Sequence, residues 1–242
     1  MRMKEVSICG LSAVRSRFET APLTIKRLFF TQQIAPEIGD ICSKLAEARR
    51  AYRCVEEEDL LRISGSVHHG GIVAVVERPP FRSPSLDQVR EWSVAGLSML
   101  VLDCIGNPHN LGAIVRTAAF FGVTKLILAD HPLAALPTDA TYRVAAGGLE
   151  HMEVYVVKYM NEFLHDIRQY YEVVGAATAG GNPRLGRTTR KPVAIVLGNE
   201  EEGLAAEVAA ECDRLVTIPG CGRVESLNVS AAAAVLIWEC TR

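Results

Sequence analysis

Short apolar runs recur between helical patterns throughout the second part of this 242-residue sequence. Each run is rich in Val, Ile and Leu and does not alternate with polar residues, which is typical of strands buried on both faces of a sheet. The five runs occupy residues 99–103, 125–129, 173–177, 193–197 and 214–218. Because helical patterns separate them, the sequence predicts an α/β domain over residues 97–242 in which helices cover a parallel sheet.

A second, smaller α/β domain is predicted over residues 1–77, where β-branched runs also alternate with helical patterns. Strands are expected at residues 6–9, 25–30, 52–55 and 72–76, and helices at residues 11–18, 36–50 and 56–62. Three prolines within residues 78–85 break either periodicity and stiffen the chain. Residues 78–96 are therefore predicted to link the two domains.

The composition excludes several classes of protein. Hydrophobic residues make up 49% of the chain, which is enough for a substantial packed core. The longest apolar stretches, residues 94–102 and 229–238, fall short of the roughly 18 residues that a membrane-spanning helix needs. The first residues lack the apolar block of a signal peptide. We therefore expect a cytoplasmic protein with no membrane partner, and the His and Cys spacing predicts no metal site.

Charge is distributed unevenly along the chain. The formal net charge is −2, yet residues 1–53 hold ten Lys and Arg residues against five Asp and Glu residues. A basic first part on an acidic remainder is expected where the first domain contacts phosphates. A solvated helical surface would have the same composition, so charge alone leaves both interpretations open.

The loops after three predicted strands hold the polar residues of interest, because parallel sheets bind ligands beyond the carboxyl ends of their strands. In the first loop, within residues 107–122, Asn110 can cap the following helix with its side-chain oxygen. That helix is apolar on nearly every face except at Arg116, whose guanidinium must be paired or face a polar cavity. Arg116 either forms a salt bridge with Asp103 or Asp130, or it binds a phosphate or positions a reacting hydroxyl.

The second loop, residues 197–204, combines glycines with acids. Gly198 and Gly203 permit a tight turn and a close approach of the backbone to a ligand. The acids at residues 200–202 would repel a nucleotide phosphate, and they would tolerate a cationic ligand or pair with Arg116. Solvated acids at a helix start are the alternative interpretation, and the one that we favour for Glu201 and Glu202.

The third loop ends in three small polar residues, Ser226, Asn228 and Ser230, at the start of an otherwise apolar helix. One such residue suffices to cap the helix, so three together indicate a site. Capping alone remains an alternative for Ser226 or Ser230 taken singly.

Together these loops resemble the three signature motifs of the SpoU/TrmH family of RNA ribose 2′-O-methyltransferases, within the SPOUT superfamily. The matching residues are, in chain order, Asn110-x-Gly112-Ala113-Ile114-x-Arg116-Thr117, Leu197-Gly198-x-Glu200-x-x-Gly203-Leu204 and Ser226-Leu227-Asn228-Val229-Ser230. Residues 1–77 resemble the substrate-binding domain that precedes the catalytic domain in many members. The chain departs from the family at His69-Gly70-Gly71, where His-Gln-Gly is usual, at Glu201, where glycine is frequent, and at Gly220, where methionine commonly follows the proline.

The resemblance implies a catalytic domain with a trefoil knot, a homodimer that pairs through the knot region, and S-adenosylmethionine as the cofactor. Residues 231–238 are apolar, which suits them to the interface of such a dimer. The family implies Thr178, Gly198, Ile218 and Leu227 as cofactor contacts. It also implies catalytic or substrate-fixing roles for Arg116, Asn110, Glu200, Ser226 and Asn228.

The implied reaction is methyl transfer to a ribose 2′-hydroxyl of RNA, and the two-domain layout favours ribosomal RNA over tRNA as the substrate. Three alternatives stay open: a tRNA 2′-O-methyltransferase, a base methyltransferase, and a non-catalytic RNA-binding or assembly protein that retains the fold. A loop over residues 182–191 holds four cations, Arg184, Arg187, Arg190 and Lys191. This loop is either an RNA-binding segment that closes over the phosphate backbone or a mobile solvated loop.

Overall fold

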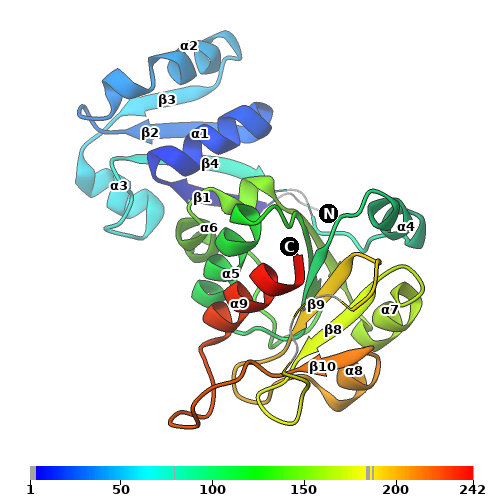
Figure 1. The fold of residues 1–242 in the computed structure, drawn as a ribbon. Helices are drawn as coiled ribbons and strands as arrows, with labels where there is room; N and C mark the ends of the chain where they lie inside the picture. The colour runs from blue at the N-terminus through cyan, green and yellow to red at the C-terminus, as the bar shows by residue number, and fades with distance from the viewer. Residues whose placement is uncertain (1–3, 79, 184–185, 187, 242) are drawn as a thin grey trace. The chain divides into compact units, whose positions relative to one another are not determined.

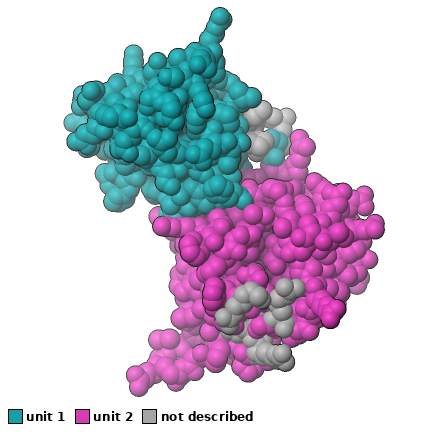
Figure 2. Space-filling model, turned by 45° about the horizontal axis from the view of Figure 1, so that its top comes forward, with its two compact units in different colours: residues 1–80, 137–151 teal, residues 81–136, 152–242 magenta. Residues whose placement is uncertain are grey.

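The computed structural model describes residues 4–78, 80–183, 186 and 188–241. The chain forms two compact units, one of Met1–Pro80 with Pro137–His151 and one of Phe81–Leu136 with Met152–Arg242 (Figure 2). The segment Pro137–His151 therefore packs with the first unit, although the sequence analysis assigned it to the second domain. The domain boundaries at residues 77 and 97 stay a prediction.

A four-stranded sheet forms the centre of the first unit, with the strand order β1-β4-β2-β3 (Figure 1). Strand β4 is antiparallel to both β1 and β2, whereas β3 runs parallel to β2. The strands are β1 (Lys4–Cys9), β2 (Ile25–Phe30), β3 (Ala51–Cys54) and β4 (Ile72–Arg78), and the helices are α1 (Leu11–Thr20), α2 (Gly39–Glu47) and α3 (Glu57–Ser64). All the strands and helices predicted for residues 1–77 form, with ends that differ by a few residues.

The segment Pro137–His151 adds a short helix, α6 (Asp139–Ala145), and a 3-10 turn at Gly148–His151 to the first unit. Helix α6 packs on β1, where the Ser7 amide donates to Asp139 Oδ1 at 3.2 Å. Arg17 Nε lies 2.5 Å from Glu150 Oε2, and both side chains are almost fully buried. Burial raises the pKa of Glu150 to about 7, and the Arg17 guanidinium offsets this only in part.

We expect Arg17→Met to lower the free energy of unfolding of the first unit by about 3 kcal/mol, because the buried Glu150 loses its counter-charge. The double variant with Glu150→Gln removes both charges and should recover most of this loss. Hydrogen exchange at the amides of β1 and β4 measures the stability of this unit by itself. Equal destabilisation in the single and double variants would contradict the expected coupling.

The second unit contains a six-stranded sheet with the order β10-β8-β9-β5-β6-β7, in which all neighbouring strands are parallel (Figure 1). The strands are β5 (Met99–Leu102), β6 (Lys125–Ala129), β7 (Glu153–Val157), β8 (Glu172–Ala176), β9 (Val193–Leu197) and β10 (Arg214–Val216). The predicted parallel sheet is thereby confirmed. Strand β7 was not predicted, because it is an edge strand whose partly exposed residues do not form a fully buried run.

Helices cover both faces of this sheet. On one face α5 (Pro108–Phe120) packs against α9 (Val229–Thr241), which lies on β9. The other helices are α4 (Leu86–Val94), α7 (Met160–Ile167) and α8 (Ala206–Ala210), where α7 contacts both α4 and α8. No helix among the described residues is long and apolar enough to cross a membrane.

Helix α4 lies inside residues 78–96, which the sequence analysis predicted to be a linker. Its start is fixed by a capping box, in which the Ser85 hydroxyl accepts from the Gln88 amide and the Gln88 side chain accepts from the Ser85 amide. The predicted linker therefore contains a helix over residues 86–94, while its bounds stay a prediction. The Ser-x-x-Gln spacing was a readable signal for this helix.

Candidate active site

A cavity of about 460 Å³ opens beyond the carboxyl ends of β8, β9 and β10. Its walls come from residues 176–179, from the loop after β9, from Leu215, Val216 and Ile218, and from α9 with the segment that leads into it. All four predicted cofactor contacts line it, namely Thr178, Gly198, Ile218 and Leu227. The structure therefore brings these four residues, predicted from three separate loops, into one cavity.

The lining of this cavity is acidic. Glu200, Glu202 and Glu225 contribute carboxylates, and no Lys, Arg or His occurs among the described residues of the lining. Carboxylates around a concave surface attract a positively charged ligand and disfavour a free phosphate. The acidic lining therefore agrees with the preference for a cationic ligand over a phosphate that the acids of the second loop predicted.

Gly198 allows the loop after β9 to close on itself. A Cβ atom at this position would lie only 2.2 Å from the carbonyl carbon of Gly203, so no side chain fits. The Asn199 amide donates to the Gly203 carbonyl, and the Gly203 amide donates to the Asn199 carbonyl, each at 2.9 Å. Gly203 has φ 76°, a left-handed conformation that suits glycine. The two glycines thus fix the turn that forms one cavity wall.

Asn199 braces the same loop, and the sequence analysis did not single it out. Its side-chain oxygen accepts from the amides of Glu201 and Glu202, at 2.9 and 3.2 Å. Its side-chain nitrogen donates to the Cys104 carbonyl at 3.0 Å. An Asn that bonds backbone amides two and three residues ahead is a common turn-former, so its place after Gly198 was the available signal.

Two side-chain hydrogen bonds join the three motif loops. Asn110 Nδ2 donates to Glu200 Oε1 at 2.8 Å, and Asn228 Nδ2 donates to Asn110 Oδ1 at 3.2 Å. Glu200 and Asn228 line the cavity, as does Ser226, and Asn110 bridges the first two. Four of the five predicted catalytic residues therefore gather at the cavity.

Glu200 is held in its ionised form. Partial burial raises its pKa, but the hydrogen bond from Asn110 and those from backbone amides, including that of Gly106 at 3.3 Å, outweigh this effect. The pKa of Glu200 therefore lies below its ordinary value. At neutral pH this carboxylate acts as a hydrogen-bond acceptor rather than as a proton donor.

The helix caps differ from those expected. Asn107, not Asn110, caps α5: its side chain accepts from the His109 amide at 2.8 Å, and Pro108 takes the first helical position. At the start of α9, Asn228 Oδ1 accepts from both the amide and the hydroxyl of Ser230, at 2.9 and 2.6 Å. The prediction that Asn110 caps its helix is therefore wrong, which leaves its side chain available to Glu200.

Arg116 lies outside the cavity of its own chain. Its side chain is exposed on α5, six residues or about 9 Å along the helix from Asn110. It makes no hydrogen bond or ion pair with any residue that the structure describes. The alternative of a salt bridge with Asp103 or Asp130 is thus not realised, and the guanidinium is available to another molecule.

The structure describes two of the four cations that were predicted to bind RNA. Arg184 and Arg187 lie outside the described residues. Arg190 is exposed, whereas Lys191 Nζ donates to the Arg168 carbonyl at 2.8 Å, at the C-terminal end of α7. Lys191 therefore has a structural contact besides any contact with RNA. No group of His, Cys, Asp and Glu side chains in the described part of the chain could hold a metal ion.

The fold and the site define a class, that of α/β proteins of two units whose ligand cavity lies beyond the carboxyl ends of a parallel sheet. The profile of the SpoU rRNA Methylase family matches residues 98–238, and that of the RNA 2′-O ribose methyltransferase substrate-binding domain matches residues 7–82. The chain belongs to the SpoU rRNA methylase family. The resemblance inferred from the three loops is thereby confirmed.

Relatives of this chain are named as rRNA or tRNA/rRNA methyltransferases. It is 34% identical to the uncharacterized tRNA/rRNA methyltransferase YfiF of Escherichia coli O157:H7, over 98% of this chain and 68% of the relative. It is 31% identical to the 23S rRNA (guanosine-2′-O-)-methyltransferase RlmB of Nitrosomonas europaea, over 97% of this chain and 90% of the relative. Some relatives are longer, and the chain spans 58% of one from Synechocystis.

Solved structures share the α/β fold. An AdoMet-bound rRNA methyltransferase from Sinorhizobium meliloti aligns with a TM-score of 0.79 and 25% identity, over 97% of this chain and 86% of that one. A putative RNA methyltransferase of the TrmH family from Porphyromonas gingivalis aligns with a TM-score of 0.75 and 26% identity, over 97% and 88%. These alignments confirm the predicted α/β class with its parallel sheet, while the trefoil knot stays a prediction.

We expect Gly198→Ala to lower the free energy of unfolding by about 1–3 kcal/mol, because the new methyl group would overlap the Gly203 backbone. Gly220→Ala is the matched control: nothing lies within 4 Å of its Cβ position, and its cost should stay within about 0.5 kcal/mol. Thermal or denaturant unfolding measures both. Equal stability of the two variants would argue against the closed turn.

Proposed function

We propose that this protein transfers a methyl group from S-adenosylmethionine to a ribose 2′-hydroxyl of ribosomal RNA. The observation that carries the proposal is the acidic cavity where the second and third motif loops meet, with the first loop hydrogen-bonded to both. Membership of the SpoU rRNA methylase family supports the reaction. Relatives named 23S rRNA (guanosine-2′-O-)-methyltransferase favour ribosomal RNA over tRNA.

The cavity residues fit S-adenosylmethionine. A volume of about 460 Å³ lies in the usual range for small-molecule sites. Leu197, Ile218 and Leu236 offer apolar surface for a flat ring, and Gly198 brings backbone close to the cavity. The carboxylates suit the positive charges of a sulfonium and an ammonium group. Thr178, Gly198, Ile218 and Leu227 are the proposed cofactor contacts.

When bound, S-adenosylmethionine supplies a reactive sulfonium methyl group, so the chain mainly has to align the ribose hydroxyl with it. Good alignment contributes roughly 7–11 kcal/mol to lowering such a barrier. Glu200 and Asn110 hold each other, and Asn228 holds Asn110, so these three side chains enter the reaction already oriented. Ser226 offers a hydroxyl at the cavity for the ribose or the cofactor.

Arg116 is proposed to orient the RNA phosphate and to stabilise the alkoxide that develops as the 2′-hydroxyl loses its proton. A guanidinium with a pKa above ~12 is a poor base, so it would not take the proton of the hydroxyl. Its proposed role is electrostatic stabilisation of the alkoxide. Its exposure and the absence of a described polar partner are consistent with a contact made in a complex.

We also propose a homodimer that forms on α5 and α9. Phe120 and Trp238 are 82% and 48% exposed, and the Phe121 ring lies between them with centroid distances of 5.1 and 5.5 Å. An exposed aromatic patch of this kind is typical of interfaces. Arg116 lies on the same helix α5. A second copy of the chain bound to this patch would therefore lie beside Arg116 and complete the site around it. The trefoil knot implied by the resemblance is part of this proposal.

The RNA is proposed to contact the first unit, which matches the substrate-binding profile, and the cations Arg184, Arg187, Arg190 and Lys191. The reaction requires access to RNA, and we propose that it takes place in the cytoplasm.

Methyl transfer from labelled S-adenosylmethionine to ribosomal RNA and to tRNA tests the function directly. Digestion of the product should yield a 2′-O-methylated nucleoside from ribosomal RNA. If only tRNA is labelled, the substrate is tRNA and not ribosomal RNA. If the product holds a methylated base, the assignment of the ribose as acceptor is overturned. Failure to bind S-adenosylmethionine in calorimetry would instead favour a non-catalytic RNA-binding protein.

Arg116→Ala should lower kcat by about 100-fold or more, because one group that stabilises developing charge is lost. Its affinity for S-adenosylmethionine should stay nearly unchanged, since Arg116 does not line the cavity. Arg90→Ala, which removes an exposed arginine from α4, is the matched control and should retain full activity. Full activity of Arg116→Ala would remove Arg116 from the mechanism.

Phe120→Asp combined with Trp238→Asp should convert the protein to monomers, because two charges would be placed in the proposed apolar interface. Val94→Asp, at a position 83% exposed on α4, is the control and should leave the oligomeric state unchanged. Sedimentation equilibrium measures the mass of each variant. A monomeric wild-type protein would contradict the proposed dimer.

A further inference from the structure

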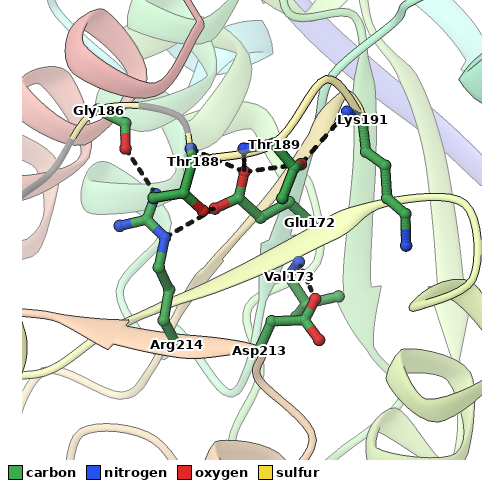
Figure 3. A network of polar contacts seen from close by, with 8 residues as sticks. All are labelled: Glu172, Val173, Gly186, Thr188, Thr189, Lys191, Asp213 and Arg214. Carbon is green, nitrogen blue, oxygen red and sulfur yellow. Dashed lines mark hydrogen bonds and ion pairs between the residues drawn. The ribbon is translucent and has the colours of Figure 1, made fainter.

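A buried ion pair lies at the amino ends of β8 and β10 (Figure 3). The cavity opens beyond the carboxyl ends of the same strands. Glu172 and Arg214 are the first residues of these strands, and their side chains are 2% and 13% exposed. Arg214 Nε donates to Glu172 Oε1 at 2.8 Å. Burying two charges is costly unless further hydrogen bonds satisfy the remaining polar atoms.

Those further hydrogen bonds come from the loop between β8 and β9 (Figure 3). The amides of Thr188 and Thr189 donate to Glu172 Oε2 at 3.3 and 3.2 Å, and both threonine hydroxyls also donate to this carboxylate. Arg214 Nη2 donates to the Gly186 carbonyl at 2.9 Å. Burial raises the pKa of Glu172, but these bonds and Arg214 outweigh it and lower the pKa to about 2.

The outgoing half of the same loop forms a wall of the cavity. Residues 177–179 line the cavity directly after β8. The Gly181 amide then donates to Thr217 Oγ1 at 2.9 Å, and the Asn182 amide donates to the Leu215 carbonyl at 2.8 Å. The loop is therefore attached to β10 near the cavity and to the Glu172–Arg214 pair at the other end.

Two more walls of the cavity lead to the same pair. Strand β10 begins with Arg214 and continues into Leu215 and Val216, which line the cavity. Helix α9 contributes Leu236 to the lining and carries Cys240 one turn later. Burial raises the pKa of the Cys240 thiol, and the nearby Arg214 guanidinium offsets this in part. The loop is thus bonded to this ion pair, the strand contains Arg214, and the helix lies beside it.

We propose that Glu172 and Arg214 are positioning residues. They hold three walls of the cavity, namely the loop after β8, strand β10 and helix α9, in fixed relative positions and thereby set the affinity for S-adenosylmethionine. The identity of this ligand rests on the proposed function. Neither residue is among the described residues that line the cavity, so both act through the loop, β10 and α9. Stability alone does not account for the pair, because apolar residues of similar volume often replace a buried ion pair without loss of stability.

The double variant Glu172→Met with Arg214→Met tests this proposal, because it keeps the buried volume and removes both charges. Thr188 and Thr189 are exposed, so their freed donors can bond to water and the loop is released. The dissociation constant and the KM for S-adenosylmethionine should rise about tenfold or more. The kcat at saturating cofactor should stay within about twofold, because the catalytic groups are unchanged.

Lys125→Met is the matched control. It removes a buried ammonium group of the same sheet, which pairs with Glu153 and lies over the Trp92 ring, but none of these residues lines the cavity. Its affinity for S-adenosylmethionine should equal that of the wild type whatever its stability. The milder variant Thr188→Val with Thr189→Val removes only the two hydroxyls that donate to Glu172 and should show a smaller rise in the dissociation constant.

Hydrogen exchange supplies a readout that needs no ligand. In the double variant the amides of Ala177 and Thr217, which are hydrogen-bonded beside the cavity, should exchange faster, whereas those of β6 should not. Unchanged affinity and unchanged exchange in a folded double variant would overturn the proposal. An equal rise in the dissociation constant for Lys125→Met would also overturn it. A wild-type protein that does not bind S-adenosylmethionine would refute the proposed function, while the exchange experiment would still decide the positioning role.

Discussion

The candidate site depends on two hydrogen bonds that join segments far apart in the sequence. Asn110 reaches Glu200 across 90 residues of chain, and Asn228 reaches Asn110 across 118. Glu200 lies in the loop after β9, Asn110 in the first turn of α5, and Asn228 directly before α9. All three lie beyond the carboxyl ends of parallel strands, so the sheet order brings them together. If the three segments did not meet, the acidic residues would be solvated side chains at the start of a helix. The asparagines would then serve only to form turns.

The sequence predicted the interior of the fold better than its margins. The boundaries of β6 and β9 agree with the apolar runs at residues 125–129 and 193–197, because strands buried on both faces must be apolar throughout. Edge strand β7 was missed because its partly exposed residues form no apolar run, and helix α4 was missed although its Ser-x-x-Gln start was readable. The packing of Pro137–His151 with the first unit depends on long-range contacts that no local pattern encodes.

The same distinction applies to the candidate site. The glycines and acids of the second loop could be read from the sequence, because a turn that excludes a Cβ demands glycine. The helix cap was assigned to Asn110 instead of Asn107, since either residue can cap a helix and only the structure shows which one turns towards Glu200. The Glu172–Arg214 pair was invisible, because each residue alone resembles an exposed charge at a strand end.

The composition of the first unit from two separate stretches of chain has a consequence for how such proteins evolve. Residues 137–151 supply a helix on β1 and a buried acid for Arg17, so a gene fragment that stops at Pro80 encodes an incomplete unit. Recombination that simply joins a new leading domain to the catalytic portion would leave this helix without its partner surface. Replacement of the leading domain therefore requires matched changes at two distant places in the gene.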